Sequence, residues 1–124
     1  MQPNVYEANC PSRQLLDRIG DTWSVLVVVT LAEGIHRYTE LAKRIEGVSP
    51  KMLTQTLRGL ERDGLITRTV HPVVPPRVDY ALTELGHSLY ALVEGLEKWA
   101  ETHIEDVQAA RAAYDATVQA YSAK

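Results

Sequence analysis

Residues 49–63 read Ser-Pro-Lys-Met-Leu-Thr-Gln-Thr-Leu-Arg-Gly-Leu-Glu-Arg-Asp, and this stretch decides the fold. Ser49 is a good N-cap, because its side-chain oxygen can accept from the first free backbone N–H groups of a helix. Pro50 suits the first helical position, where no N–H is needed. Gly64 can take the left-handed conformation that ends a helix. The stretch therefore predicts a helix whose two ends are both defined locally.

The predicted helix has two chemically different faces. At about 100° per residue, the apolar positions Leu53, Leu57 and Leu60 fall on one side. The opposite side carries cations and an amide, namely Lys51, Gln55, Arg58 and Arg62, with Thr54 at its border. Such groups contact phosphates and purine edges in a major groove. A plain solvated face is the alternative, and the neighbouring sequence has to decide between the two.

A short helix and a tight turn precede residues 49–63. Thr39 is the expected cap of a helix at residues 40–46. The inward-facing positions of that helix are expected to be Leu41, Ala42 and Ile45. Residues 46–49, Glu-Gly-Val-Ser, then form a four-residue turn with glycine. Two short helices joined in this way are the helix-turn-helix signature, with the second helix as the reader.

Two further helices are expected upstream. Residues 10–20 show an apolar stripe that includes Leu15, and Gly20 ends the pattern. Residues 23–32 are rich in β-branched side chains, which favours a strand. A cap at Asp21 or Thr22 and a length near eleven favour a buried helix, which we adopt. Residues 35–38 are a candidate short strand.

A β-hairpin is predicted directly after the helix-turn-helix. Residues 65–70 are the first strand, and residues 77–82 alternate between apolar and polar positions as a half-buried strand does. The prolines between them exclude a tight two-residue turn. A hairpin in this place is a wing. Arg68 and Arg77 flank its tip, from which they could reach a phosphate backbone or the minor groove.

The C-terminal third predicts a dimer. A heptad-like seam begins at Leu85, and a capping box at residues 102–105 predicts that a new helix starts at His103. Self-association is the natural use of this apolar surface, whereas folding back on the same domain is the alternative. The expected interface residues are Leu15, Leu89, Leu92, Leu96, Trp99, Ile104, Val107 and Tyr114.

Composition sets the wider limits. The 124 residues are 45% apolar and 23% charged, as in an ordinary one-domain protein. Residues 13–77 hold ten Lys and Arg against seven Asp and Glu, whereas residues 78–124 hold three against eight. A basic middle beside an acidic end is typical of a DNA-facing module joined to a module with another task.

We expect a cytoplasmic protein. The N-terminus lacks the basic and apolar regions of a signal peptide, and the longest apolar run is far short of the roughly 20 residues of a membrane span. One cysteine cannot form an internal disulfide. The expected organisation is an arm at residues 1–9, a winged helix-turn-helix domain at residues 10–100 and an accessory helix at residues 101–124. The fold class is mostly α with a small β-hairpin wing.

Together these motifs resemble the HxlR-type regulators, which are related in architecture to the MarR regulators. The residues that carry the resemblance are Cys10-Pro11, Gly20-Asp-Thr-Trp23, Gly34, Arg37-Tyr-Thr-Glu-Leu41, Ser49-Pro-Lys-Met-Leu53, Leu57-Arg58, Leu60-Glu-Arg-Asp-Gly-Leu65, Arg68, Pro76-Arg-Val-Asp-Tyr80 and Leu82-Thr-Glu-Leu-Gly86.

The resemblance implies a helix at residues 23–32, a homodimer on a palindromic operator, residues 49–63 as the recognition helix and residues 68–77 as the wing. The chain departs from the family at Asp21-Thr22, where the family usually has Gly-Lys. It also departs at the apolar wing tip, Val73-Val74.

The resemblance also suggests an input signal. Some members of the family sense oxidants through the cysteine of the Cys-Pro pair, and Cys10 stands at a helix N-terminus near Arg13, where the thiolate is favoured. A packing role for Cys10 is the alternative. The other candidate input is a small apolar or aromatic effector, whose pocket residues would be Trp23, Tyr90, Trp99 and Tyr114.

From these residues we assign provisional roles in DNA binding. Gln55 and Arg58, with Thr54 as a lesser candidate, are expected at base edges. The expected contacts to phosphates or the minor groove are Ser49, Lys51, Arg62, Arg68 and Arg77.

Other classes fit less well. The four histidines are scattered, and no Gly-rich phosphate loop or nucleophile elbow is present, so we expect no enzyme, metal or cofactor. The serious alternative is a winged helix used for protein–protein interaction. Such a surface would be expected to show exposed aromatic or aliphatic anchors on the outer face of residues 49–63, which carries none.

Overall fold

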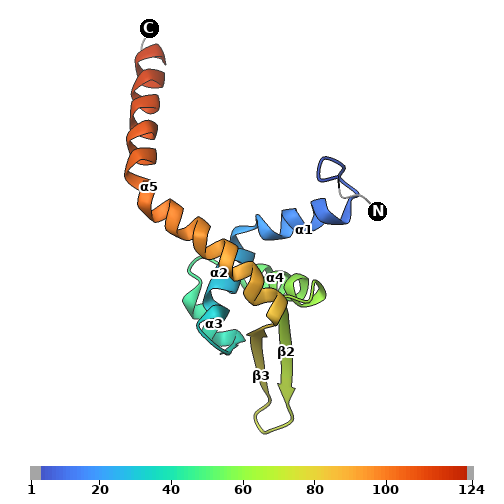
Figure 1. Ribbon diagram of the computed structural model, residues 1–124. Helices are drawn as coiled ribbons and strands as arrows, with labels where there is room; N and C mark the ends of the chain where they lie inside the picture. The colour runs from blue at the N-terminus through green and yellow to red at the C-terminus, as the bar shows by residue number, and fades with distance from the viewer. Residues whose placement is uncertain (1–3, 123–124) are drawn as a thin grey trace. The chain divides into compact units, whose positions relative to one another are not determined.

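The computed structural model describes residues 4–122 and is mostly helical with a small sheet, as predicted (Figure 1). The chain divides into two compact units, residues 1–93 and residues 94–124. Its elements, in order, are α1 (Pro11–Ile19), α2 (Thr22–Ala32), β1 (His36–Arg37), α3 (Tyr38–Arg44), α4 (Pro50–Arg62), β2 (Ile66–His71), β3 (Arg77–Leu82) and α5 (Glu84–Ser122).

Helix α2 is the centre of the core in the first unit. The carboxylate of Asp21 caps it by accepting from the backbone N–H and the hydroxyl of Ser24, both at 3.1 Å. Its β-branched residues do not make it a strand, because packing on several sides overrides the local preference. Val27, Val28 and Leu31 are buried with the apolar face of α4 and with Ile66 and Tyr80 of the sheet. The prediction of a buried helix is confirmed.

The sheet is antiparallel with the strand order β1-β3-β2. Strand β3 pairs with β2 from Ile66 opposite Leu82 to His71 opposite Arg77, which leaves residues 72–76 as the loop of the hairpin. In Figure 1 this hairpin extends away from the helices of the first unit. The two-residue strand β1 pairs with the other edge of β3 and ties the hairpin to α3.

Helix α4 has the ends that its sequence predicts. The hydroxyl oxygen of Ser49 accepts from the backbone N–H of Met52 at 3.1 Å, and Pro50 begins the helix. Gly64 follows the helix with a φ of 75°, which favours glycine. There the N–H of Leu65 donates to the carbonyl of Leu60, a bond typical of a helix that ends at a left-handed residue.

Three local predictions were wrong. Helix α3 starts at Tyr38, so Thr39 is not its cap; instead Glu40 accepts from the backbone N–H of Arg37 at 2.9 Å. Ala42 is exposed, because a helix of seven residues presents only a narrow face to the core. No helix starts at His103.

Helix α5 instead runs through this point without interruption, from Glu84 to Ser122. The hydroxyl of Thr102 donates to the carbonyl of Lys98, one turn earlier, and so is satisfied inside the helix without capping a new one. Within residues 4–122, no helix combines the length and apolar character needed to cross a membrane.

Candidate nucleic-acid interface

The outer face of α4 is a cationic surface. Lys51, Gln55, Arg58 and Arg62 are exposed, because Leu53, Leu57 and Leu60 on the opposite face are buried in the core. Within the described part of the chain, no ion pair neutralises Lys51, Arg58 or Arg62. The fold therefore fixes three free positive charges on one exposed helix face.

A groove separates this face from the wing. Its cavity measures about 400 Å³ and is lined by side chains of α3, α4, β2 and β3: Tyr38, Thr54, Leu57, Arg58, Glu61, Arg68 and Tyr80. Arg58 and Arg68 thus approach the same groove from two elements that are separate in sequence. Sequence reasoning missed Tyr38 and Glu61. The spacing of three residues from Arg58 to Glu61 was the available signal for the carboxylate.

Two smaller candidates at the start of α4 are partly engaged. The hydroxyl of Tyr38 donates to the carbonyl of Pro50 at 3.2 Å and lies 3.4 Å from Oγ1 of Thr54, which is half-buried. Ser49 uses a lone pair as the helix cap, and its hydroxyl proton stays available to a phosphate. Gln55 has the clearest access to an external partner among the neutral candidates of α4.

The wing holds its two arginines differently. Arg68 lies in the middle of β2, opposite Tyr80, so the prediction that it flanks the hairpin tip was wrong because the strand continues three residues beyond it. Arg77 does adjoin the tip, but its Nε is 3.5 Å from Oδ1 of Asp79. Nε2 of His71 lies 2.9 Å from the other oxygen of the same carboxylate. Asp79 therefore partly neutralises Arg77, whereas Arg68 has no ion-pair partner among the residues described.

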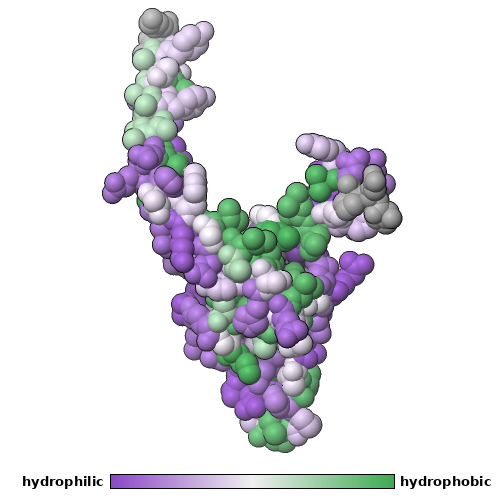
Figure 2. All heavy atoms as spheres, in the orientation of Figure 1, coloured by the Kyte–Doolittle hydropathy of each residue, from purple (hydrophilic) through white to green (hydrophobic). Residues whose placement is uncertain are grey.

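The tip of the wing is apolar. Val73 and Val74 are exposed, Val74 almost completely at 99%. Figure 2 shows this hydrophobic end of the hairpin at the bottom of the view, next to hydrophilic strand surface. The charge of the wing therefore lies along its strands rather than at its tip.

Cys10 stands at the N-terminus of α1, as expected. Its thiol sulfur accepts from the backbone N–H of Asn4 at 3.3 Å, and the residue is 8% exposed. The Asn4 hydrogen bond is the largest cause that lowers the pKa of the Cys10 thiol, and the backbone N–H of Arg13 acts in the same direction against burial. The thiolate is therefore more populated at a given pH than that of an ordinary cysteine.

Most of the expected interface residues have free surface in the single chain. The exposed ones are Leu15, Leu92, Leu96, Trp99, Ile104 and Tyr114, and Val107 is half-buried. Leu89 is different: it packs in the core of its own chain at 9% exposure, because the first turns of α5 cover that core. Placing Leu89 on the seam was therefore wrong. Of the four candidate effector residues, Trp23 and Tyr90 pack against the core, whereas Trp99 and Tyr114 are exposed.

A family model for the HxlR-like helix-turn-helix matches residues 18–108. The chain belongs to the HxlR-like helix-turn-helix family. The match includes α4, the wing and residues 84–108 of α5, so the cationic surface described above lies on a known DNA-binding architecture. This HxlR-like protein is a DNA-binding transcriptional regulator, which is a non-enzymatic class.

Relatives agree with this assignment. The HTH-type transcriptional regulator YtfH of Escherichia coli K12 is 44% identical over 108 residues, which cover 87% of this chain and 86% of that protein. A solved structure of the transcriptional regulator ytfH from Salmonella typhimurium is 42% identical, with a TM-score of 0.83 over 89% of this chain and 98% of that one. The redox regulator HypR in its oxidized form is 36% identical, with a TM-score of 0.69 over 75% and 96% of the two chains.

Proposed function

We propose that this HxlR-like protein binds a palindromic operator as a homodimer, with α4 in the major groove and the wing on the backbone or in the minor groove. One observation carries the proposal: Lys51, Arg58 and Arg62 share the outer face of α4 and have no ion-pair partner among the described residues. Desolvating a face of uncompensated cations is favourable only against a strongly anionic partner, and duplex DNA is the partner that the family binds.

The side chains take different roles in this proposal. Gln55 and Arg58 read base edges, since an amide and a guanidinium form bidentate pairs with adenine and guanine. Thr54 has a smaller share, because its hydroxyl already lies beside Tyr38. The phosphate contacts come from Ser49, Lys51, Arg62, Arg68 and Arg77. Arg58 and Arg68 line one groove, so a backbone segment held by Arg68 would seat Arg58 on the adjacent bases.

The homodimer is supported by apolar side chains that a single chain leaves uncovered. In the second unit, Leu96 is 66% exposed and Trp99 60% exposed, on the same side of α5 as Tyr114 by helical spacing. Large exposed apolar stripes mark association surfaces. A two-fold dimer would present two copies of α4 to two half-sites one helical turn apart.

Selection of bound duplexes from a random DNA pool tests this function. We expect enrichment of a palindrome with half-site centres about 10 base pairs apart. Enrichment of one unrepeated half-site would contradict the dimer. If no sequence is enriched and binding to duplex DNA is undetectable at low salt, the proposed function is contradicted and the alternative of a protein-binding winged helix is favoured.

Oxidation of Cys10 is our candidate for the signal that controls DNA binding. The lowered pKa of the Cys10 thiol supports this candidate, as does the similarity to HypR, which is a redox regulator. A gel shift with and without diamide, repeated for Cys10→Ser, tests it: diamide should change the binding of the wild type alone. Identical shifts for both proteins in both conditions would end this idea. An effector bound near Trp23, Tyr90, Trp99 and Tyr114 stays a prediction.

The pH dependence of the thiol gives a second readout. Because the pKa is lowered, the thiolate persists to lower pH, and alkylation by iodoacetamide should fall off at a lower pH than for an unfolded peptide containing the same cysteine. A protein profile at or above that of the peptide would show that the thiol is not activated.

A further inference from the structure

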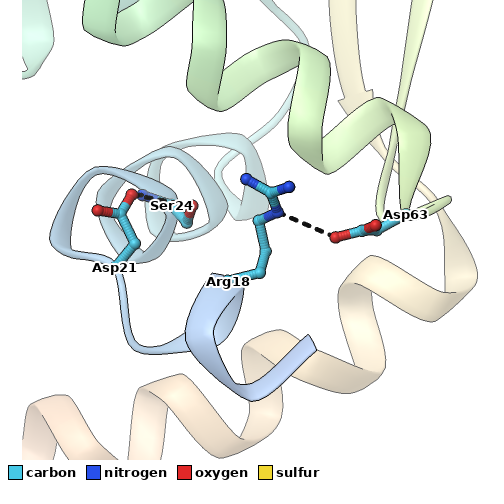
Figure 3. Close-up of polar contacts among 4 residues, drawn as sticks. All are labelled: Arg18, Asp21, Ser24 and Asp63. Carbon is cyan, nitrogen blue, oxygen red and sulfur yellow. Dashed lines mark hydrogen bonds and ion pairs between the residues drawn. The ribbon is translucent and has the colours of Figure 1, made fainter. Parts of the chain in front are cut away.

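Arg18 of α1 reaches the C-terminal end of the recognition helix. Its Nε donates to Oδ2 of Asp63 at 3.0 Å, and both side chains are half-buried, at 32% and 22% exposure (Figure 3). The two residues are 45 positions apart in sequence. This contact is a charge-assisted hydrogen bond between elements, whereas the Arg13–Asp17 pair on the same helix stays within α1.

Gly59 makes room for this contact. A Cβ atom built on Gly59 would collide with the guanidinium group of Arg18. Glycine within a helix is unfavourable compared with alanine, so local propensity gives no reason for it in the last turn of α4. The guanidinium group of Arg18 occupies the space that a side chain at this position would take.

The contact with Arg18 also explains why an acidic residue, Asp63, stands at the end of α4. It is the C-cap of α4, where a carboxylate faces the negative end of the helix dipole. The guanidinium group placed against it compensates this repulsion. Two locally unfavourable choices, Gly59 and Asp63, therefore serve one contact.

The rest of α1 is loosely packed, so the contact with Asp63 is important for holding this helix in place. No residue of α1 is fully buried. An apolar cavity of about 210 Å³ lies beside the helix, lined among others by Leu15, Ile19, Asp63 and Leu65. Apolar packing alone therefore leaves α1 incompletely fixed on this side, and the polar contact to Asp63 restrains it.

We propose that Arg18 is a positioning residue that, together with Gly59 and Asp63, holds α1 against the C-terminal end of α4 and so steadies that end of the reader helix, on which the affinity for specific DNA depends. We call this contact the α1–α4 latch. It rests on the proposed function, because the positioned element is the reader helix. It also links DNA binding to the helix that begins after Cys10.

Three variants test the latch against the duplex selected by the wild-type protein and a shuffled duplex of equal composition. Arg18→Ala removes the donor, Asp63→Ala removes the acceptor, and Gly59→Ala displaces the guanidinium group while it improves helix propensity. Arg13→Ala is the matched control, since it removes one arginine from α1 and leaves the latch intact. Circular dichroism establishes that each protein is folded.

We expect Arg18→Ala and Asp63→Ala to bind the selected duplex about tenfold more weakly, as for loss of one charge-assisted hydrogen bond, with little change on the shuffled duplex. Gly59→Ala should cost less, because the end of the flexible Arg18 side chain can shift away from the new methyl group. Arg13→Ala should stay within about twofold of the wild type. Asp63→Ala is the sharpest case, because loss of a negative charge would by itself tighten DNA binding. Tighter or unchanged binding of Arg18→Ala and Asp63→Ala to the selected duplex would overturn the latch.

A measurement without DNA separates the two proposals. Hydrogen exchange of the backbone amides at residues 59–65 should be faster in all three latch variants than in the wild type and in Arg13→Ala. If the wild type selects no DNA sequence, the proposed function fails. The hydrogen-exchange measurement still decides whether the latch restrains the end of α4. Equal exchange in all five proteins would overturn the latch even if DNA binding is established.

Discussion

Helix α4 and the second unit of the chain, residues 94–124, are both amphipathic, yet the fold treats their apolar sides differently. Leu53, Leu57 and Leu60 of α4 are at most 2% exposed, inside the core of their own chain. Leu96 and Trp99 in the second unit are more than half exposed. The polar sides differ as well, since α4 presents free cations and the second unit carries an acidic excess.

The difference shows which of the two apolar sides is buried within a single chain. One chain suffices to bury the inner face of α4. Its cationic outer face is therefore already positioned in the single protomer. Within residues 94–122 no apolar side chain is fully buried, and an exposed apolar stripe is typical of an association surface. DNA recognition is thus prepared by the protomer, and association is expected to be a property of two chains.

The largest expected effect is on the inner face of α4. Leu60→Ala should lower the free energy of unfolding by about 2–5 kcal/mol, because it leaves a cavity in a fully buried site. Urea denaturation followed by circular dichroism measures it. Leu96→Ala, studied at a dilution where the chain is monomeric, is the matched control and should change stability by less than about 0.5 kcal/mol. An equal loss in both variants would show that residues 94–124 have a core of their own.

The next effect concerns the exposed stripe. Trp99→Ala should weaken the dimer by about 2 kcal/mol or more, roughly a thirtyfold rise in the dissociation constant, because aromatic anchors dominate interfaces. Sedimentation equilibrium measures the constant. Gln119→Ala, on the opposite side of α5 by helical spacing, should leave it unchanged. An unchanged dissociation constant for Trp99→Ala would contradict the comparison, since the exposed apolar stripe would then lie outside the dimer interface.

The outer face of α4 gives the third prediction. Arg58→Ala should reduce discrimination between the selected and shuffled duplexes by about 1–3 kcal/mol, the worth of a bidentate base contact. Lys51→Ala, a cation at the start of the same face, should weaken both duplexes alike. Fluorescence anisotropy with both duplexes distinguishes these outcomes. Full discrimination by Arg58→Ala would mean that another residue reads the bases.

The smallest effect separates the two wing arginines. Arg68→Ala should reduce the slope of log affinity against log salt by about 0.9, the value for one phosphate contact. Arg77→Ala should reduce it by less, because Asp79 already lies 3.5 Å from its Nε. Titrations at several salt concentrations provide both slopes. A larger change for Arg77 would show that Asp79 releases it when DNA binds.

Much of the fold was predictable from local chemistry. Ser49, Pro50 and Gly64 define the ends of α4, and the leucine spacing defines its buried side. Thr39 and Thr102 misled, because a hydroxyl at a plausible cap position can also lie inside a helix and bond to the preceding turn, as Thr102 does. Leu89 was misplaced because one heptad-like pattern covers two different environments. Leu89 packs in the core of its own chain, whereas Leu96, further along the same helix, is exposed.

The candidate site divides in the same way. The sequence by itself determined the cationic face of α4, the HxlR-type motif series and the presence of a wing, because spacing along one helix or hairpin is a local property. Arg77 and Asp79 lie two positions apart on one face of β3, so their pairing could have been expected from the strand spacing alone. Only the tertiary structure decided that Arg58 and Arg68 line one groove and that Arg18 lies against Gly59 and Asp63. The groove and the Arg18 contacts join residues from separate elements, and no local pattern specifies which elements pack together.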